Sequence, residues 1–122
     1  MTAARIFVRF RVEGFHRWPA APDHRGYLAS EHRHCFHVEV SCENVHDDRE
    51  IEFHDLLDYS KAVFPGGRMG AKTCEMMARE LALLLASEFN RRFQCSVSED
   101  GECGATVVFD PIGSDPAHND AI

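Results

Sequence analysis

The fold of this chain is indicated most directly by one stretch, His32-Arg33-His34-Cys35-Phe36-His37-Val38-Glu39-Val40. From Phe36 to Val40 apolar residues alternate with polar ones, which is the pattern of a β-strand with one buried face. Side chains two apart on a strand point to the same face, so His32 and His34 can converge on one metal ion. The stretch therefore predicts a strand that begins with two metal ligands.

A third imidazole follows an earlier alternating stretch. Apolar residues at every second position from Ile6 to Val12 predict a strand over about Arg5 to Glu13, and His16 comes shortly after it. Three neutral histidine nitrogens with an open fourth position describe a catalytic rather than a structural zinc site. We therefore predict that Zn²⁺ is held by the three histidines His16, His32 and His34.

Composition limits the classes of function. With 122 residues, 44% of them hydrophobic, the chain can form one domain with a real core, which we place at residues 1–110. The net charge of -7 argues against a direct nucleic-acid partner. A membrane span and a signal-peptide core are both missing from the sequence pattern, so we expect a cytoplasmic protein without a membrane partner. The five cysteines form no C-x-x-C pair and support neither a disulfide framework nor a cysteine-based zinc site.

The order of the remaining elements predicts the fold class. A long loop with breakers joins the first two strands, and a loop of this length is commonly functional. Residues 111–122 are rich in polar residues, Pro and Gly, and are expected to form a flexible tail. The order β-β-α-α-β-β predicts an α+β fold in which two helices cover one face of an antiparallel four-stranded sheet. The expected elements after the first strand are a strand over His34–Glu43, a helix over Phe53–Phe64, a helix capped by Thr73, and strands over Phe93–Ser98 and Ala105–Phe109.

Five short motifs follow one another along the chain: Phe15-His16-Arg17, His32-Arg33-His34 with its strand, Glu52-Phe53-x-x-Leu56, Thr73-Cys74-Glu75 and Val97-Ser98-Glu99. In this order they resemble the motifs of the 6-pyruvoyltetrahydropterin and 6-carboxytetrahydropterin synthases. The resemblance covers roughly Ile6 to Phe109 and implies the T-fold, zinc on the three histidines, and Glu99 as the anchor of a pterin. It also implies a homo-oligomer, a trimer or a hexamer, whose sheets join into a barrel.

The chain also departs from this family. The synthases carry a catalytic Cys a few residues before the His pair, where this chain has Tyr27-Leu28-Ala29-Ser30-Glu31. They also carry a Leu-Asp-His proton relay, but the segment from Tyr59 to Lys72 contains neither Asp nor His. Arg33 replaces the middle Gly of the metal motif. The resemblance therefore implies a divergent member that keeps the zinc and the ligand anchor but has lost the usual proton-transfer residues.

Four further residues are candidates for the site. The two acceptor oxygens of Glu99 match the paired N–H donors on the guanidine-like edge of a pterin or a 7-deazaguanine, although Glu99 could also be a solvated turn residue. Glu31 and His24 share the loop with the metal ligands and are candidates for the missing catalytic acid and base. Arg33 could bind a substrate carboxylate or simply face solvent.

These residues lead to a hypothesis of function. We expect a zinc-dependent lyase of 7-deazaguanine (queuosine-related) metabolism that decarboxylates 7-carboxy-7-deazaguanine to 7-deazaguanine, in a bacterial or phage-infected cytoplasm. Decarboxylation leaves electron density on a ring carbon and needs only one proton, so a metal and one general acid could suffice. Two alternatives stay open: a 6-carboxytetrahydropterin synthase with substituted acid-base residues, and a catalytically inert protein that binds zinc and a pterin.

Overall fold

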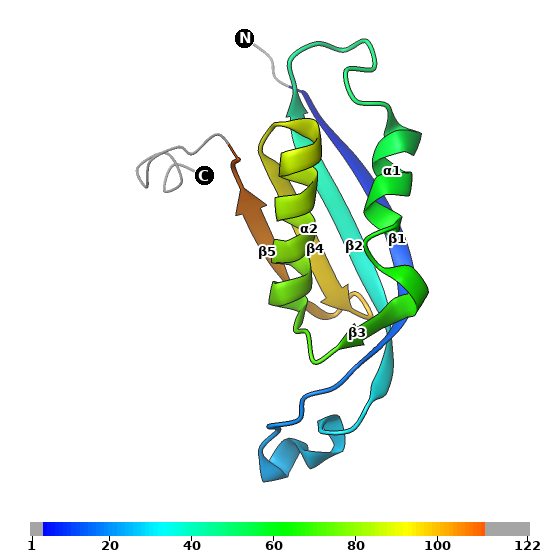
Figure 1. The fold of residues 1–122 in the computed structure, drawn as a ribbon, viewed down its shortest axis with the longest axis vertical. Helices are drawn as coiled ribbons and strands as arrows, with labels where there is room; N and C mark the ends of the chain where they lie inside the picture. Colours follow the sequence, from blue (N-terminus) through cyan, green and yellow to red (C-terminus); the bar gives the residue numbers. More distant parts are fainter. Residues whose placement is uncertain (1–3, 112–122) are drawn as a thin grey trace.

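Two long antiparallel strands form the centre of the fold in this computed structural model, which describes residues 4–111 (Figure 1). Strand β1 runs over Ala4–His16 and strand β2 over His32–Asn44. They pair without interruption from Ala4 opposite Asn44 to His16 opposite His32. At about 3.4 Å per residue, each strand is about 44 Å long. Both predicted strands are confirmed, but each extends further towards the connecting loop than its apolar alternation indicated.

The sheet has five strands in the order β3-β1-β2-β4-β5. Strands β4 (Phe93–Glu99) and β5 (Cys103–Phe109) form an antiparallel hairpin, and β4 pairs with β2. The additional strand, β3 (Arg68–Gly70), pairs parallel to the end of β1. The α+β class and the four long strands were predicted, but β3 was not, and it makes the sheet mixed rather than purely antiparallel.

Glycines explain why β3 could not be predicted. Gly67 has a φ of 66°, and a Cβ there would lie 2.2 Å from the carbonyl oxygen of Glu13. Only glycine therefore lets the backbone reach the edge of β1 at this point. The 3-10 turn η2 (Pro65–Gly67) and a strand of three residues are also too short to show a periodic pattern.

Two helices cover one face of the sheet, as predicted (Figure 1). Helix α1 spans Phe53–Lys61 and ends before Phe64, the end that the sequence pattern indicated. Helix α2 spans Cys74–Phe89, and the Thr73 hydroxyl caps it by accepting from the backbone N–H of Met76 at 3.1 Å. Between helices and sheet lies the core, whose fully buried members include Phe36, Val38, Val40, Leu56, Leu81, Leu85, Phe93 and Val97.

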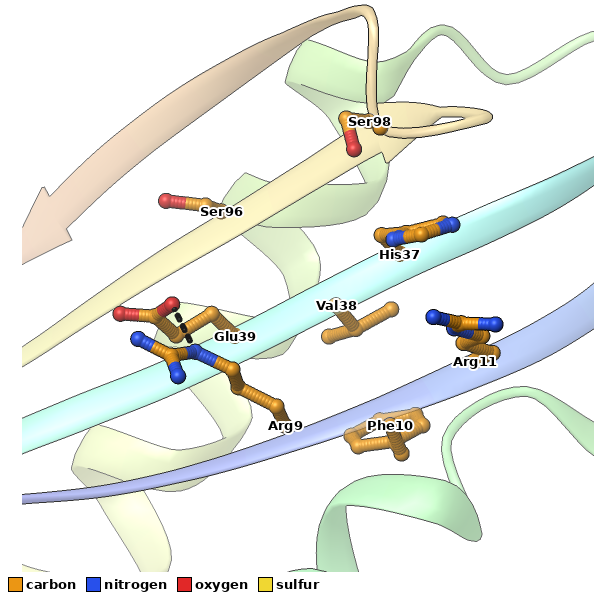
Figure 2. A pocket seen from close by; sticks show the side chains of 9 residues that line it. Arg9, Phe10, Arg11, His37, Val38, Glu39, Ser96 and Ser98 are labelled. Atoms are coloured by element: carbon orange, nitrogen blue, oxygen red, sulfur yellow. Dashed lines mark hydrogen bonds and ion pairs between the residues drawn. The ribbon is translucent and has the colours of Figure 1, made fainter.

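The opposite face of the sheet carries polar and charged side chains (Figure 2). The loop that joins the end of β1 to the start of β2 contains a short 3-10 helix, η1 (Asp23–Leu28). This loop extends beyond the two helices (Figure 1). Of the tail predicted for residues 111–122, everything from position 112 lies outside the described residues. Among residues 4–111 no helix is both long and apolar enough to cross a membrane.

Candidate metal centre and adjoining pocket

Three histidines come together where β1 ends and β2 begins. His16 is the last residue of β1 and lies directly opposite His32, and His34 follows on the same face of β2. The ring centroids of His16 and His32 are 4.5 Å apart, and that of His34 lies 5.2 Å from His16 and 5.0 Å from His32. The pairing of the two strands therefore assembles the cluster.

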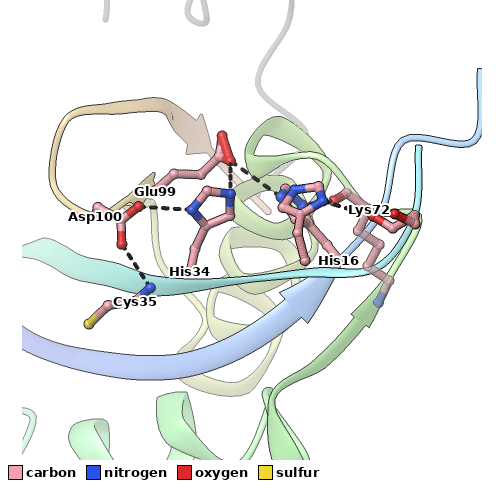
Figure 3. A network of polar contacts seen from close by, with 8 residues as sticks. His16, His34, Cys35, Lys72, Glu99 and Asp100 are labelled. Carbon is pink, nitrogen blue, oxygen red and sulfur yellow. Dashed lines mark hydrogen bonds and ion pairs between the residues drawn. The ribbon is translucent and has the colours of Figure 1, made fainter. Parts of the chain in front are cut away.

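Glu99, the last residue of β4, completes this cluster (Figure 3). One potential ligand atom from each of the four residues lies within 4.8 Å of the others. The Glu99 Oε2 atom is 2.9 Å from His34 Nε2 and 3.3 Å from His16 Nε2. We call these four residues the metal cluster. The sequence pattern had placed Glu99 at the substrate, but it did not show that this carboxylate touches the histidines.

Hydrogen bonds on the outer side of the cluster determine which nitrogen of each imidazole carries the proton. The Nδ1 atom of His16 lies 3.0 Å from the carbonyl oxygen of Lys72, and that of His32 lies 3.0 Å from the carbonyl of Ser30. The Nδ1 atom of His34 is 2.8 Å from Asp100 Oδ2. Because carbonyl and carboxylate oxygens accept, each Nδ1 carries the proton and each Nε2 keeps its lone pair, which is the arrangement of a metal-binding histidine.

The inner side of the cluster fits a cation. The Nε2 atoms of His16 and His34 are buried without a hydrogen-bond donor, and both lie close to the Oε2 atom of Glu99, which is itself an acceptor. A divalent cation satisfies all four groups at once, and three imidazoles with one carboxylate are ligands that zinc accepts.

Asp100 supports the cluster from the turn between β4 and β5. While its Oδ2 accepts from His34, its Oδ1 accepts from the backbone N–H of Cys35 at 2.9 Å. These two hydrogen bonds hold the pKa of Asp100 below its usual value, and the bond from Cys35 has the larger effect. Asp100 is therefore ionised at neutral pH and orients the His34 ring.

A pocket of about 410 Å³ adjoins the metal cluster. His16, His32 and Glu99 form part of its wall, and the half-exposed Trp18 adds an aromatic surface. The lining also contains Leu28, Lys72, Cys74 and Cys103.

Two thiols in this wall were not recognised from the sequence. Cys74 is buried, and burial raises its pKa to about 11. Cys103 is exposed and lies opposite Glu99 in the register of the β4–β5 hairpin. The spacing of Glu99 and Cys103 around a tight turn is the signal that could have identified the second thiol.

The other predicted site residues do not line the pocket beside the metal cluster. Glu31 precedes His32 and His24 belongs to η1; both are exposed, and the described residues that line the pocket include neither. Arg33 points to the opposite face of β2, where its guanidinium lies 3.6 Å from the carboxylate of Glu13. The proposed roles of these three residues stay predictions.

Comparison with known proteins places the fold. No protein-family model and no curated protein matches the sequence. A Plasmodium vivax 6-pyruvoyltetrahydropterin synthase, in a variant whose catalytic glutamate is replaced by alanine, matches with a TM-score of 0.66 and 16% identity. The Plasmodium falciparum 6-pyruvoyltetrahydropterin synthase matches with a TM-score of 0.63 and 14% identity. Each match covers 90% of this chain and 99% of the other. The chain therefore has the fold of the 6-pyruvoyltetrahydropterin synthases.

Proposed function

We propose that this protein is a zinc-dependent carbon–carbon lyase that acts on a guanine-like bicycle, a pterin or a 7-deazaguanine, in the pocket beside the metal cluster. The observation that carries this proposal is the pair of buried, unpartnered Nε2 atoms of His16 and His34, which face the Glu99 carboxylate. The shared fold with 6-pyruvoyltetrahydropterin synthases supports the choice of a pterin-like substrate.

In this proposal the three imidazoles hold the zinc, which supplies a positive charge for a substrate carboxylate or ring carbonyl. Glu99 binds the paired N–H donors of the bicycle, because its two oxygens can accept both at once. Since Glu99 also contacts His16 and His34, this role requires its carboxylate to turn from the metal cluster towards the substrate. Trp18 and Leu28 supply apolar surface for the ring, since both line the pocket.

The reaction we favour is decarboxylation of 7-carboxy-7-deazaguanine. The bond between the ring carbon and its carboxylate breaks, carbon dioxide leaves, and one proton replaces it on the ring carbon. The segment that carries a proton relay in the synthases has a supporting role in this chain: the Lys72 carbonyl accepts from His16, and the Gly70 carbonyl accepts from the backbone N–H of Arg17. A reaction that needs a single proton suits such a site.

A second candidate is a 6-carboxytetrahydropterin synthase-type reaction. The catalytic residue replaced in the Plasmodium vivax enzyme is a glutamate, so a carboxylate serves catalysis in a protein of this fold. Glu31, next to His32, is the corresponding candidate in this chain, with His24 of the same loop as its partner. We keep the third alternative, an inert protein that binds zinc and a pterin, as an outcome of the same experiment.

We further propose that the protein acts in the cytoplasm as a homo-oligomer, a trimer or a hexamer. Its sheet ends in two open edges, at β3 and at the seven-residue β5, and exposed edges favour pairing with another copy. Light scattering checks this, and a stable monomer at micromolar concentration would count against it.

The activity test uses the zinc-loaded protein with 7-carboxy-7-deazaguanine and, in parallel, with dihydroneopterin triphosphate. Mass spectrometry should detect 7-deazaguanine from the first substrate and little product from the second. His34→Ala should lose zinc and activity, while His46→Ala, an exposed histidine beyond the far end of β2, should keep both. Efficient carboxytetrahydropterin formation would favour the synthase. If no product forms from either substrate although zinc is bound, the inert protein is favoured.

Binding is tested separately with Glu99→Gln. The amide places one donor against the N–H donors of the bicycle, so affinity measured by titration calorimetry should fall about tenfold to a hundredfold. An unchanged affinity would remove Glu99 from the proposed substrate site.

A further inference from the structure

The sheet face that the helices leave open contains a hollow of about 540 Å³ (Figure 2). Its walls are side chains of β1, β2 and β4, among them Arg9, Arg11, His37, Glu39 and Ser98. This hollow lies on the opposite side of the sheet from the core residues Val40 and Val97 and shares no lining residue with the pocket beside the metal cluster.

Two neighbouring rows of side chains cross the sheet in this hollow. The first row consists of Arg9, Glu39 and Ser96, which lie opposite one another on β1, β2 and β4. Arg9 Nε donates to Glu39 Oε2 at 2.6 Å, and the Ser96 hydroxyl bonds to that of Thr106 at 2.7 Å. The two charges of the first row are therefore paired with each other, and its hydroxyl has a partner on β5.

The second row also runs from an arginine on β1 to a serine on β4, but its central residue differs. It consists of Arg11, His37 and Ser98, again opposite one another, with a histidine in place of the central glutamate. Directly opposite side chains have Cβ atoms about 4.5 to 5.5 Å apart, so the guanidinium, the imidazole and the hydroxyl can reach one small ligand. All three groups can donate hydrogen bonds, and the row contains no carboxylate.

Arg11 is also unusual among the arginines of this face. Arg5, Arg9 and Arg33 have a carboxylate oxygen at 3.8, 2.6 and 3.6 Å, respectively. Within residues 4–111, Arg11 forms no ion pair, because its cross-strand neighbour is His37. An arginine without a carboxylate partner on an exposed face can form a charge-assisted contact with an anionic ligand.

The position of His37 is fixed by the turn above it. A Cβ at Gly101 would lie 3.3 Å from His37 Cε1, so the turn packs directly on the ring. Asp100 lies in the same turn, and its carboxylate accepts bonds from His34 and from the backbone of Cys35. This acid is thus already engaged on the metal side.

We propose that the row of Arg11, His37 and Ser98 binds a small oxyanion, a phosphate or carboxylate group, on the open face of the sheet. The guanidinium contacts two oxygens of the anion; the imidazole and the hydroxyl contact the remaining oxygens of a phosphate, or share the two oxygens of a carboxylate. This site is independent of the reaction proposed for the metal cluster.

The test is an NMR titration of the zinc-loaded full chain with inorganic phosphate, with sodium chloride keeping the ionic strength constant. Saturable shifts are expected at Arg11, His37 and Ser98. Arg11→Gln should weaken phosphate binding about tenfold to a hundredfold, because it removes a charge-assisted contact. His37→Glu should weaken it at least about tenfold, because it rebuilds the first row and gives Arg11 a carboxylate partner.

Arg5→Gln is the matched control. It removes the same charge from the same face of β1, about 20 Å along the strand, and should change the affinity less than about twofold. The proposal is overturned if phosphate does not saturate the wild-type signals, if Arg5→Gln and Arg11→Gln weaken binding equally, or if the shifts are confined to the metal cluster.

Discussion

Replacement of Asp100 by Asn tests whether the outer hydrogen bonds prepare His34 for metal. The aspartate accepts two bonds, from His34 Nδ1 at 2.8 Å and from the Cys35 N–H at 2.9 Å. Asparagine has one acceptor oxygen, so it can keep only one of them. If its amide nitrogen faces His34, the imidazole proton moves to Nε2 and blocks the metal-binding lone pair. If it faces Cys35, two donors oppose each other and the turn is displaced.

In either orientation we expect the zinc affinity to fall about tenfold to a hundredfold, the usual effect of losing such a supporting contact. The fold should survive, since Asp100 has a φ of 57° and asparagine adopts this left-handed conformation readily. Competition with a chromophoric chelator measures the affinity, and circular dichroism checks the fold. Glu102→Gln, which removes the same charge from the same turn, is the control. A zinc affinity of Asp100→Asn within about twofold of the control would refute this account of the site.

Three other predictions concern stability and reactivity. Thr73→Ala removes the cap of α2 and should lower the free energy of unfolding by about 1 kcal/mol in a denaturant titration. Iodoacetamide at mildly alkaline pH should label the exposed Cys103 before Cys95, because burial raises the pKa of Cys95 to about 12 and keeps it a thiol; equal labelling of both would contradict the buried position of Cys95. Hydrogen bonds from a backbone N–H and from an arginine lower the pKa of Glu50 below its usual value of 4.5. These bonds therefore stabilise the folded protein fully above pH 4.5, and the stabilisation is lost as the pH falls through the lower pKa of the folded state. Unfolding of Glu50→Gln and wild type should therefore differ at neutral pH and converge in acid.

Much of the fold could be predicted because its long elements have clear periodicity. Alternation from Ile6 to Val12 and from Phe36 to Val40 defined the two central strands, and Thr73 marked the start of α2. The outer ends of β1 and β2 could not be predicted in this way, since they extend beyond the core and lose the alternation. Strand β3 is held by a glycine contact with β1, which leaves no trace in hydrophobic pattern.

The site was predicted only in part, for a related reason. His32 and His34 share a face because of their spacing, and His16 joins them because the strands pair to their very ends. The contact of Glu99 with these histidines depends on where the β2–β4 register ends, opposite Phe36, which no local pattern specifies. The same holds for Cys103, whose place in the pocket follows from the hairpin register rather than from its neighbours in sequence.

The pair of His16 and His32 closes the β1–β2 ribbon at its loop end, where strands separate most easily. A slip of one residue in this ribbon would turn the imidazoles of the two strands to opposite sides of the sheet. Only the correct alignment can therefore gather all three rings. A metal ion bound by all three rings would hold the end of the ribbon together and would favour the correct register over a shifted one. Zinc uptake would therefore indicate that the two strands have paired in the correct register.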